Sequence, residues 1–171
     1  PIGSLGAGEA QWHTDMSYLS EPPDASMLYA LEVPPSGGDT WLCGMEAALR
    51  ERHANVRRAH FETDVDKLLA NGADEWINVR DAKVARRRRE DDVRMFTEYF
   101  DGATYHEWDD IEPPIVSVSN DASLAWMIVN VRVRRTRNDE ELRFRYAGIE
   151  TFEKRDGQWI KVVEVGTFER E

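Results

Sequence analysis

Cysteine, long apolar runs and, over the first 49 residues, basic side chains are all scarce in this sequence. Cys43 is the only cysteine among 171 residues, so no disulfide can form within the chain. No apolar run approaches the roughly 20 residues that cross a bilayer. The first residues also lack the basic and apolar stretches of a secretory signal. We therefore expect a cytoplasmic protein in a reducing compartment, without a membrane partner.

The sequence also lacks the positive charge of a nucleic-acid-binding protein. Its net charge is −11 at pH 7 and its pI is about 4.9, so phosphate backbones and anionic membranes would repel it. Arg86–Arg89 is the one run of like charges. Such a run is typical of a solvated surface. The alternative, a site for an anion or a nucleic acid, conflicts with the acidic chain as a whole, and we expect no nucleic-acid partner.

The two parts of the chain differ in composition. Residues 1–49 contain no Lys or Arg, seven acidic residues, five of the seven prolines and six of the eleven glycines. A chain of 171 residues can hold one full-sized domain with an appendage. We predict a short N-terminal segment over residues 1–45 and one complete domain over residues 46–171.

The N-terminal segment contains a residue pattern that suits a metal ion. His13 and Asp15 are two positions apart, and on a strand such side chains point to the same face. They would supply two ligands of a 2-His-1-carboxylate iron site. Taken alone, however, the same pair is more often a surface or hydrogen-bonded pair, so the two residues by themselves leave both interpretations open.

The motifs WHTDMSY and PPDASMLYALEVPPSGGDT, with the interval between them, resemble the middle of TauD/TfdA-type Fe(II)/2-oxoglutarate dioxygenases. The resemblance implies that His13 and Asp15 are the first two iron ligands and that Thr40 contacts 2-oxoglutarate. It also implies a second histidine far downstream, followed by an arginine that pairs with the cosubstrate carboxylate.

The remaining histidines do not fit that pattern. They are His53, His60 and His106, and none is followed by an arginine in the expected setting. We therefore predict an incomplete half-site in a truncated segment. Fe(II) and 2-oxoglutarate are expected as cofactors only if the alternative, a working dioxygenase, holds; otherwise no cofactor is expected.

After residue 45 the sequence predicts helices first and strands afterwards. Apolar residues at three-to-four spacing predict a helix from Met45 to a turn near Thr63, and a short helix follows. A short strand and another helix come next. Five strands then alternate with turns: Thr104–Asp109, Ile115–Ser119, Leu124–Arg135, Leu142–Glu153 and Gln158–Phe168. This order indicates an α+β domain whose antiparallel sheet wraps around its helices.

The strand Leu124–Arg135 has two unlike faces. By the two-residue period, one face is wholly apolar and consists of Ala125, Met127, Val129, Val131 and Val133. The other face is mixed and consists of Trp126, Ile128, Asn130, Arg132 and Arg134. The turn residues before it predict a hairpin with Ile115–Ser119. The apolar face indicates a core, and the mixed face indicates a partly polar cavity or an interface.

A second resemblance covers about residues 46–168. The motifs RAHFETDVDKLLA, YHEWDDIEPPIVSVSNDASLAWMIVNVRV and FEKRDGQWIKVVEVGTF, in this order, look like a SnoaL-like member of the NTF2-like superfamily. The resemblance implies a cone-shaped α+β barrel, a small-molecule pocket between sheet and helices, and a homodimer formed through the sheet. It implies no single reaction, because the superfamily includes isomerases, cyclases, hydrolases, dehydratases and plain binders.

Two residues of this domain are candidates for acid–base chemistry. His106 shares a strand face with Trp108 and Asp110, and a histidine beside carboxylates can act as a general base. Glu150 lies on a largely apolar strand face, where burial would require a partner or a raised pKa. The alternatives are a hydrogen-bonded strand histidine and a glutamate exposed at a bulge.

The predicted pocket combines tryptophans with a few polar groups. The candidate apolar walls are Trp76, Trp108 and Trp126, and the candidate polar contacts are Asn130, Arg132 and Tyr146. The alternative for each tryptophan is a place in the core. Three hypotheses follow: a small-molecule-binding domain of unknown ligand, with or without isomerase, hydrolase or lyase activity; a dioxygenase; or a non-catalytic homodimer on which residues 1–49 merely pack.

Overall fold

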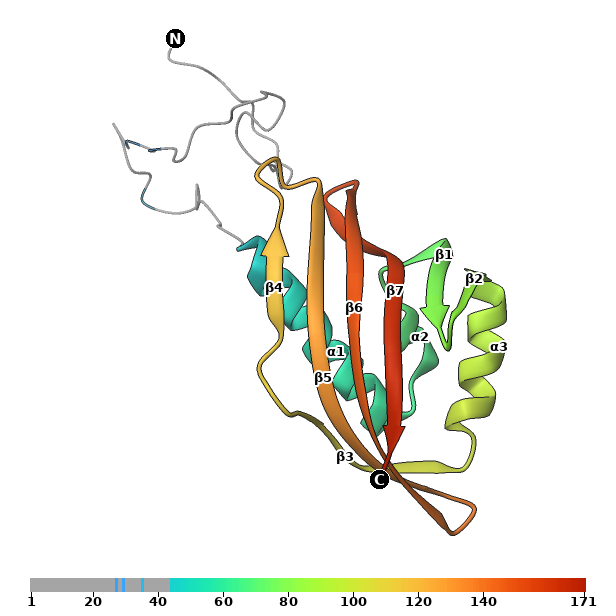
Figure 1. The fold of residues 1–171 in the computed structure, drawn as a ribbon. Coiled ribbons are helices and arrows are strands. Elements are labelled where there is room, and N and C mark those ends of the chain that lie inside the picture. The colour runs from blue at the N-terminus through green and yellow to red at the C-terminus, as the bar shows by residue number, and fades with distance from the viewer. Residues whose placement is uncertain (1–26, 28, 30–34, 36–43) are drawn as a thin grey trace.

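The computed structural model describes residues 44–171 together with positions 27, 29 and 35. The chain forms three helices and seven strands in the order α1 (Met45–Glu62), α2 (Val65–Leu69), β1 (Gly72–Arg80), β2 (Lys83–Arg88), α3 (Arg89–Phe100), β3 (Ala103–Asp110), β4 (Ile115–Val118), β5 (Leu124–Arg137), β6 (Glu140–Arg155) and β7 (Gln158–Arg170). Figure 1 shows β5, β6 and β7 as long strands that curve in front of α1. The predicted α+β class is confirmed.

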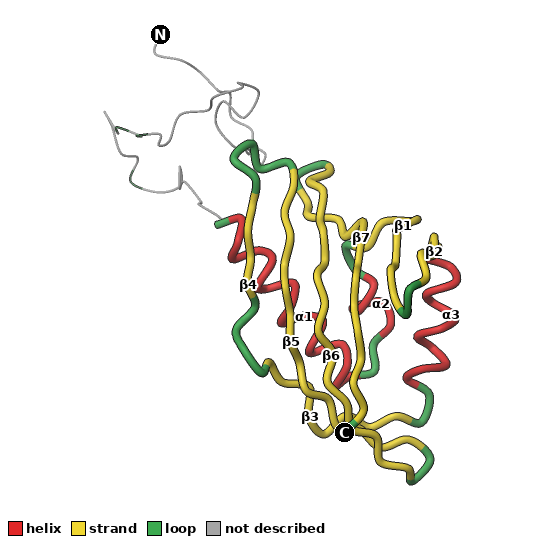
Figure 2. Tube along the Cα trace, in the orientation of Figure 1, coloured by secondary structure: helices red, strands yellow, loops and turns green. Residues whose placement is uncertain are grey.

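All seven strands belong to one sheet, in the order β2-β1-β7-β6-β5-β3, with β4 paired to β5. Every pairing is antiparallel except that between β1 and β7, which is parallel. The sheet is therefore mixed, because β1 and β2 precede the meander and join its last strand. In Figure 2, α1 and α2 lie behind the long strands and α3 lies beside β1 and β2.

A tight turn separates the first two helices. Thr63 has a positive φ of 51° and its N–H donates to His60 O, which ends α1. The Asp64 side chain then accepts a hydrogen bond of 2.9 Å from the N–H of Lys67 and starts α2. The predicted turn near Thr63 and the short helix after it are confirmed.

The predicted β4–β5 hairpin is confirmed. Ile115 pairs with Ile128, and Val118 pairs with Ala125. The Asp121 carboxylate holds the connecting turn by accepting from both Ser119 Oγ and Ser123 Oγ, at 2.6 and 2.8 Å. These hydrogen bonds lower the pKa of Asp121 to about 2.

The apolar face of β5 is buried as predicted and contributes to two neighbouring core clusters. One contains Leu49, Ala125, Met127, Val129, Phe152 and Trp159. The other contains Phe100, Tyr105, Trp108, Val131, Val133 and Phe144. Both lie between the inner face of the sheet and the helices, and this same inner face carries the polar groups described below.

A bulge in β3 changes which of its residues point inward. The pairing with β5 shifts between Tyr105, opposite Arg135, and Glu107, opposite Arg134, which leaves His106 as the extra residue. Tyr105 and Trp108 are both buried as a result, whereas His106 is exposed. The predicted grouping of His106 with Trp108 on one face is therefore wrong, since strict alternation fails at a bulge.

His60 is partly buried, and its ring packs against the second core cluster. Its Nδ1–H donates to Val56 O at 2.7 Å. The centroid of its ring lies 5.1 Å from the ring centroid of Trp108 and 5.3 Å from that of Tyr105. Burial, helped by the nearby Arg135 charge, lowers the pKa of His60 from 6.5 to about 4. The imidazole is therefore neutral in the folded protein near pH 7.

We expect this histidine to make the folded state less stable as the pH is lowered. Between pH 6.5 and pH 4 the unfolded chain binds a proton at His60 that the folded chain does not, so the folded state loses up to about 3 kcal/mol on acidification. Urea titrations at pH 4 and pH 7 should show that His60→Phe removes most of this difference. The exposed His106→Gln variant should retain it, and an unchanged difference in His60→Phe would contradict the assignment.

Candidate functional site

Four charged side chains with little exposure meet on the inner face of the sheet and form the buried charge cluster: Arg52, Glu150, Lys161 and Glu164. Arg52 Nη1 donates to Glu150 Oε2 at 3.0 Å, and Lys161 Nζ lies 3.6 Å from Glu150 Oε1. Lys161 Nζ also donates to Glu164 Oε2 at 2.6 Å. Charges buried in this way are costly unless they are paired, so the cluster marks a constrained site.

A second bulge brings two of these side chains together. Lys161 and Glu164 are three residues apart, and an ordinary strand would point them to opposite faces. The β6–β7 pairing shifts between Thr151, opposite Val163, and Phe152, opposite Lys161. The extra residue lets Lys161 and Glu164 share the inner face with Glu150.

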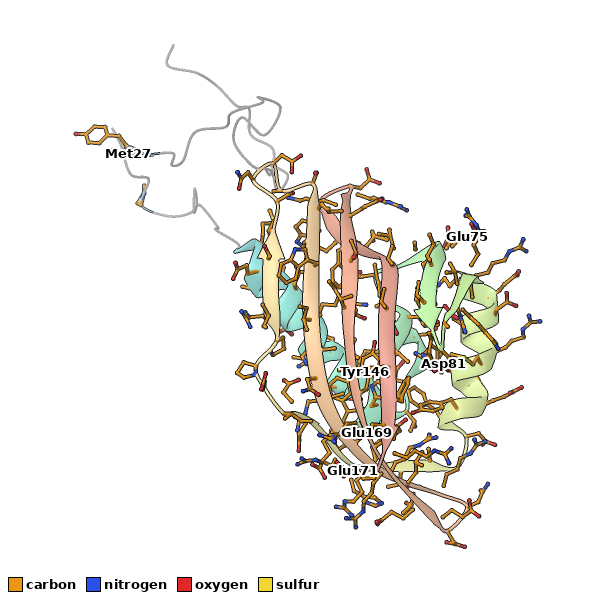
Figure 3. All side chains as sticks on the ribbon, in the orientation of Figure 1. Met27, Glu75, Asp81, Tyr146, Glu169 and Glu171 are labelled. Atoms are coloured by element: carbon orange, nitrogen blue, oxygen red, sulfur yellow. The ribbon has the colours of Figure 1, made fainter. Side chains whose placement is uncertain are left out.

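Tyr146 completes this group with a neutral donor. Its hydroxyl donates to Glu164 Oε1 at 3.1 Å, and the residue lies midway along the sheet in Figure 3. Its ring lies across Gly148 and Gly166, which face each other in register; a Cβ at Gly166 would lie 2.5 Å from Cε2 of Tyr146. Burial raises the pKa of Tyr146, so its hydroxyl keeps its proton at neutral pH.

Glu164 is held in its ionised form. Burial by itself would raise the pKa of its carboxyl, but the charge and hydrogen bond of Lys161, with the Tyr146 hydroxyl, keep that pKa below its ordinary value. Arg80 Nη2 lies 3.6 Å from the same carboxylate. The site therefore contains a fixed anion surrounded by donors.

Trp76 covers the cluster on the β1 side. The Nζ atom of Lys161 lies 4.2 Å from the centroid of the Trp76 ring. Trp76 Nε1 donates to Asp92 Oδ2 at 2.5 Å, and Arg87 Nε donates to Asp92 Oδ1 at 2.7 Å. Because Asp92 is fully buried on α3, it fixes the orientation of the tryptophan.

A cavity of about 200 Å³ opens beside Arg52. Residues from α1, from α2 and from the segment before β1 line this Arg52 cavity: Arg52, Asn55, Val56, Lys67, Leu68, Ala70 and Asn71. Arg52 is the residue that links the cavity to the buried charge cluster, because it lines one and bonds to Glu150 in the other. A small molecule in the cavity would touch the guanidinium that Glu150 holds.

The structure brings three of the predicted residues together: Glu150, Tyr146 and Trp76. The sequence reasoning missed Arg52, Lys161 and Glu164. One signal could have found them, because Glu150 and Glu164 face each other in the β6–β7 hairpin register and two adjacent carboxylates need nearby cations. The bulge that adds Lys161 has no clear sequence signature.

The other predicted pocket residues lie elsewhere. Trp108 is in the second core cluster, against the rings of His53 and His60. Trp126, Asn130 and Arg132 belong to the mixed face of β5, which points away from the buried core face. Their proposed pocket roles stay predictions, and the structure does not bring them to the Arg52 cavity.

His106 is also remote from the cluster. It is exposed on β3, and its Nε2 lies 3.0 Å from Thr136 Oγ1 on the neighbouring strand. This position matches the alternative of a hydrogen-bonded strand histidine. Its catalytic role stays an untested prediction.

The iron half-site lies outside the described residues, as do His13, Asp15 and Thr40. Within the described part of the chain, no three His, Cys, Asp or Glu side chains are grouped so that they could hold a metal ion. His53, one of the three remaining histidines, pairs with Asp110 at 2.7 Å. The half-site and the dioxygenase alternative stay predictions.

No helix in the described segments is long and apolar enough to cross a membrane. Arg86 to Arg89 each have a partner within the chain: Glu75, Asp92, Glu90 and the carbonyl of Leu69, respectively. These four guanidinium groups therefore form contacts within the chain.

Solved structures with a similar fold are known. The chain is similar to an NTF2-like protein from Cytophaga hutchinsonii, with a TM-score of 0.59, 12% identity, and coverage of 73% of this chain and 98% of that one. It is also similar to a ketosteroid isomerase-like protein from Erwinia carotovora atroseptica, with a TM-score of 0.56, 14% identity, and coverage of 70% and 92%. The predicted NTF2-like fold is confirmed.

The N-terminal part matches a different family. Residues 2–64 match the Taurine catabolism dioxygenase TauD, TfdA family. An alpha-ketoglutarate-dependent 2,4-dichlorophenoxyacetate dioxygenase from Cupriavidus pinatubonensis is 54% identical over an alignment of 67 residues, with coverage of 35% of this chain and 23% of that protein. The chain thus combines a TauD/TfdA fragment with an NTF2-like fold. The family match extends into α1, and the predicted domain boundary at residue 45 stays a prediction.

Proposed function

We propose that the NTF2-like part of the chain is a small-molecule-binding domain whose ligand occupies the Arg52 cavity. The observation that carries this proposal is the position of Arg52 between the cavity and Glu150. A buried guanidinium at the wall of a cavity gives a ligand a fixed, partly desolvated contact. We propose no cofactor for this cavity.

In acid–base chemistry on a bound molecule, Glu150 would be the proton acceptor. It is the predicted acid–base residue that lies directly behind Arg52, and Tyr146 supplies a neutral hydroxyl within the same group. An isomerase, hydrolase or lyase reaction needs such a proton acceptor near its substrate. Glu150→Gln should abolish any turnover found, while His106→Ala should leave it unchanged.

Ligand-observed NMR with a panel of fragment-sized neutral, cationic and anionic compounds tests binding. We expect at least one class to bind the unmodified chain and to lose binding in Ala70→Trp, since Ala70 is exposed at the cavity and a tryptophan there would cover it. Val84→Ala, on the exposed edge strand β2, is the control and should retain binding. No binder in the panel, or equal binding by Ala70→Trp, would contradict the proposal.

We propose further that a second copy of the chain packs on the outer face of the sheet. Ile115, Ile128, Ile149, Val165 and Val79 pair in succession across five strands and form an apolar row there. Ile115, Ile128 and Val165 are exposed. A two-fold axis would place this row against its own copy and cover it.

Val165→Glu should convert such a dimer into a monomer, because the dimer would bury two unpaired carboxylates. Sedimentation equilibrium should give 19.7 kDa for the variant and twice that mass for the unmodified chain. Val93→Glu places the same charge on α3 and should leave the dimer intact. A monomeric unmodified chain would refute this interface.

A further inference from the structure

The guanidinium of Arg52 uses its Nη1 atom in the pair with Glu150, whereas the edge formed by Nε and Nη2 has no acceptor among the described residues. Its Nη1 donates to Glu150, and its side chain is only 9% exposed. Nε is buried and has no hydrogen-bond partner among the described residues, and no described side chain accepts from Nη2. Buried donors of a charged group are rarely left unpaired, because each lost hydrogen bond costs free energy.

The ion pairs around Arg52 do not use all of its donors. The buried charge cluster contains two cations, Arg52 and Lys161, and two carboxylates, Glu150 and Glu164, and the partly exposed Arg80 lies 3.6 Å from Glu164. Lys67, on the cavity wall, already pairs with Glu62 and Asp64 at the rim. These pairs leave the buried Nε of Arg52 without an acceptor.

We propose that the Arg52 cavity takes a small organic carboxylate whose two oxygens accept hydrogen bonds from Nε and Nη2 of Arg52. The parallel N–H groups of this edge match the spacing of carboxylate oxygens. The ligand would supply the acceptor that Nε lacks. Its organic part would contact Val56, Leu68 and Ala70, the apolar residues of the wall. This inference rests on the proposed function.

Benzoate, benzamide and benzylamine are matched probes, because they share a ring and differ in charge. In calorimetric titrations of the full chain at neutral pH, benzoate should bind at least tenfold more tightly than the other two, and than inorganic phosphate. Tighter or equal binding of benzamide or benzylamine would overturn the carboxylate assignment but leave the proposed pocket standing. Equal binding of phosphate would also overturn it, since the site would then recognise any anion.

Arg52→Lys keeps the positive charge and can still reach Glu150, but it lacks the planar edge. We expect this variant to lose at least tenfold in benzoate affinity. Arg94→Gln removes one positive charge from the surface of α3, outside the cavity lining, and should lose less than threefold. Unchanged affinity in Arg52→Lys would overturn the proposal. If Arg52→Lys fails to fold, the comparison of the three probes on the unmodified chain decides the question. Failure of the whole compound panel would instead refute the proposed function itself.

Discussion

Replacing Phe152 with alanine is expected to lower the free energy of unfolding by about 3–5 kcal/mol. Phe152 is fully buried on β6 and packs in the first core cluster with Leu49, Met127 and Trp159. The Arg52 guanidinium lies 4.8 Å from the centroid of its ring. The variant thus loses apolar burial and also removes one wall of the charge cluster. A urea titration followed by circular dichroism measures the loss.

Val84→Ala provides the matched control for this variant. Val84 lies on the edge strand β2 and is 74% exposed, so its truncation should change stability by no more than about 0.5 kcal/mol. A loss below about 1 kcal/mol for Phe152→Ala would show that the first core cluster is not packed as described.

Asp92→Asn is expected to cost about 3 kcal/mol, because it removes a buried charge from its partner. The Asp92 side chain is 1% exposed and accepts from both Trp76 Nε1 and Arg87. The asparagine side chain would leave the Arg87 guanidinium without a counter-charge. Its single oxygen could not accept from both Trp76 Nε1 and Arg87 as the two carboxylate oxygens do. Thermal and urea unfolding of the variant, compared at pH 7, measure the effect.

The neighbouring carboxylate is the control for that experiment. Asp91 lies one residue earlier on α3, is half exposed and pairs with Arg94 on the surface. Solvent screens such a pair, so Asp91→Asn should cost no more than about 1 kcal/mol. Equal costs at Asp91 and Asp92 would contradict the role assigned to the buried carboxylate.

Part of the candidate site was predictable from local patterns. Glu150 and Tyr146 stand out because a two-residue period places them on the apolar face of β6, and the structure confirms this face. Lys161 and Glu164 could not be paired in the same way, since only a bulge puts residues three apart on one face. Arg52 comes from a helix far away in the sequence, and its reach to Glu150 depends on how α1 packs.

Alternation along a strand predicted the faces of β5 but not those of β3. His106 and Trp108 were placed on one face by alternation, but the bulge at His106 shifts the pairing and separates them. Trp126, Asn130 and Arg132 follow alternation correctly, yet the sequence does not say on which side of β5 the helices lie and a cavity forms. The period of a strand defines two faces, and packing decides which of them surrounds a ligand.

By itself, the sequence determined the composition break, the helices followed by a meander, the β4–β5 hairpin and the apolar face of β5. These features depend on turn chemistry and on periods that act within a few residues. Only the tertiary structure decided that β1 pairs in parallel with β7, that Lys161 and Glu164 share one face, and that Arg52 separates a cavity from Glu150. Such contacts join segments far apart in the chain, where packing and the cost of burying charge select the arrangement.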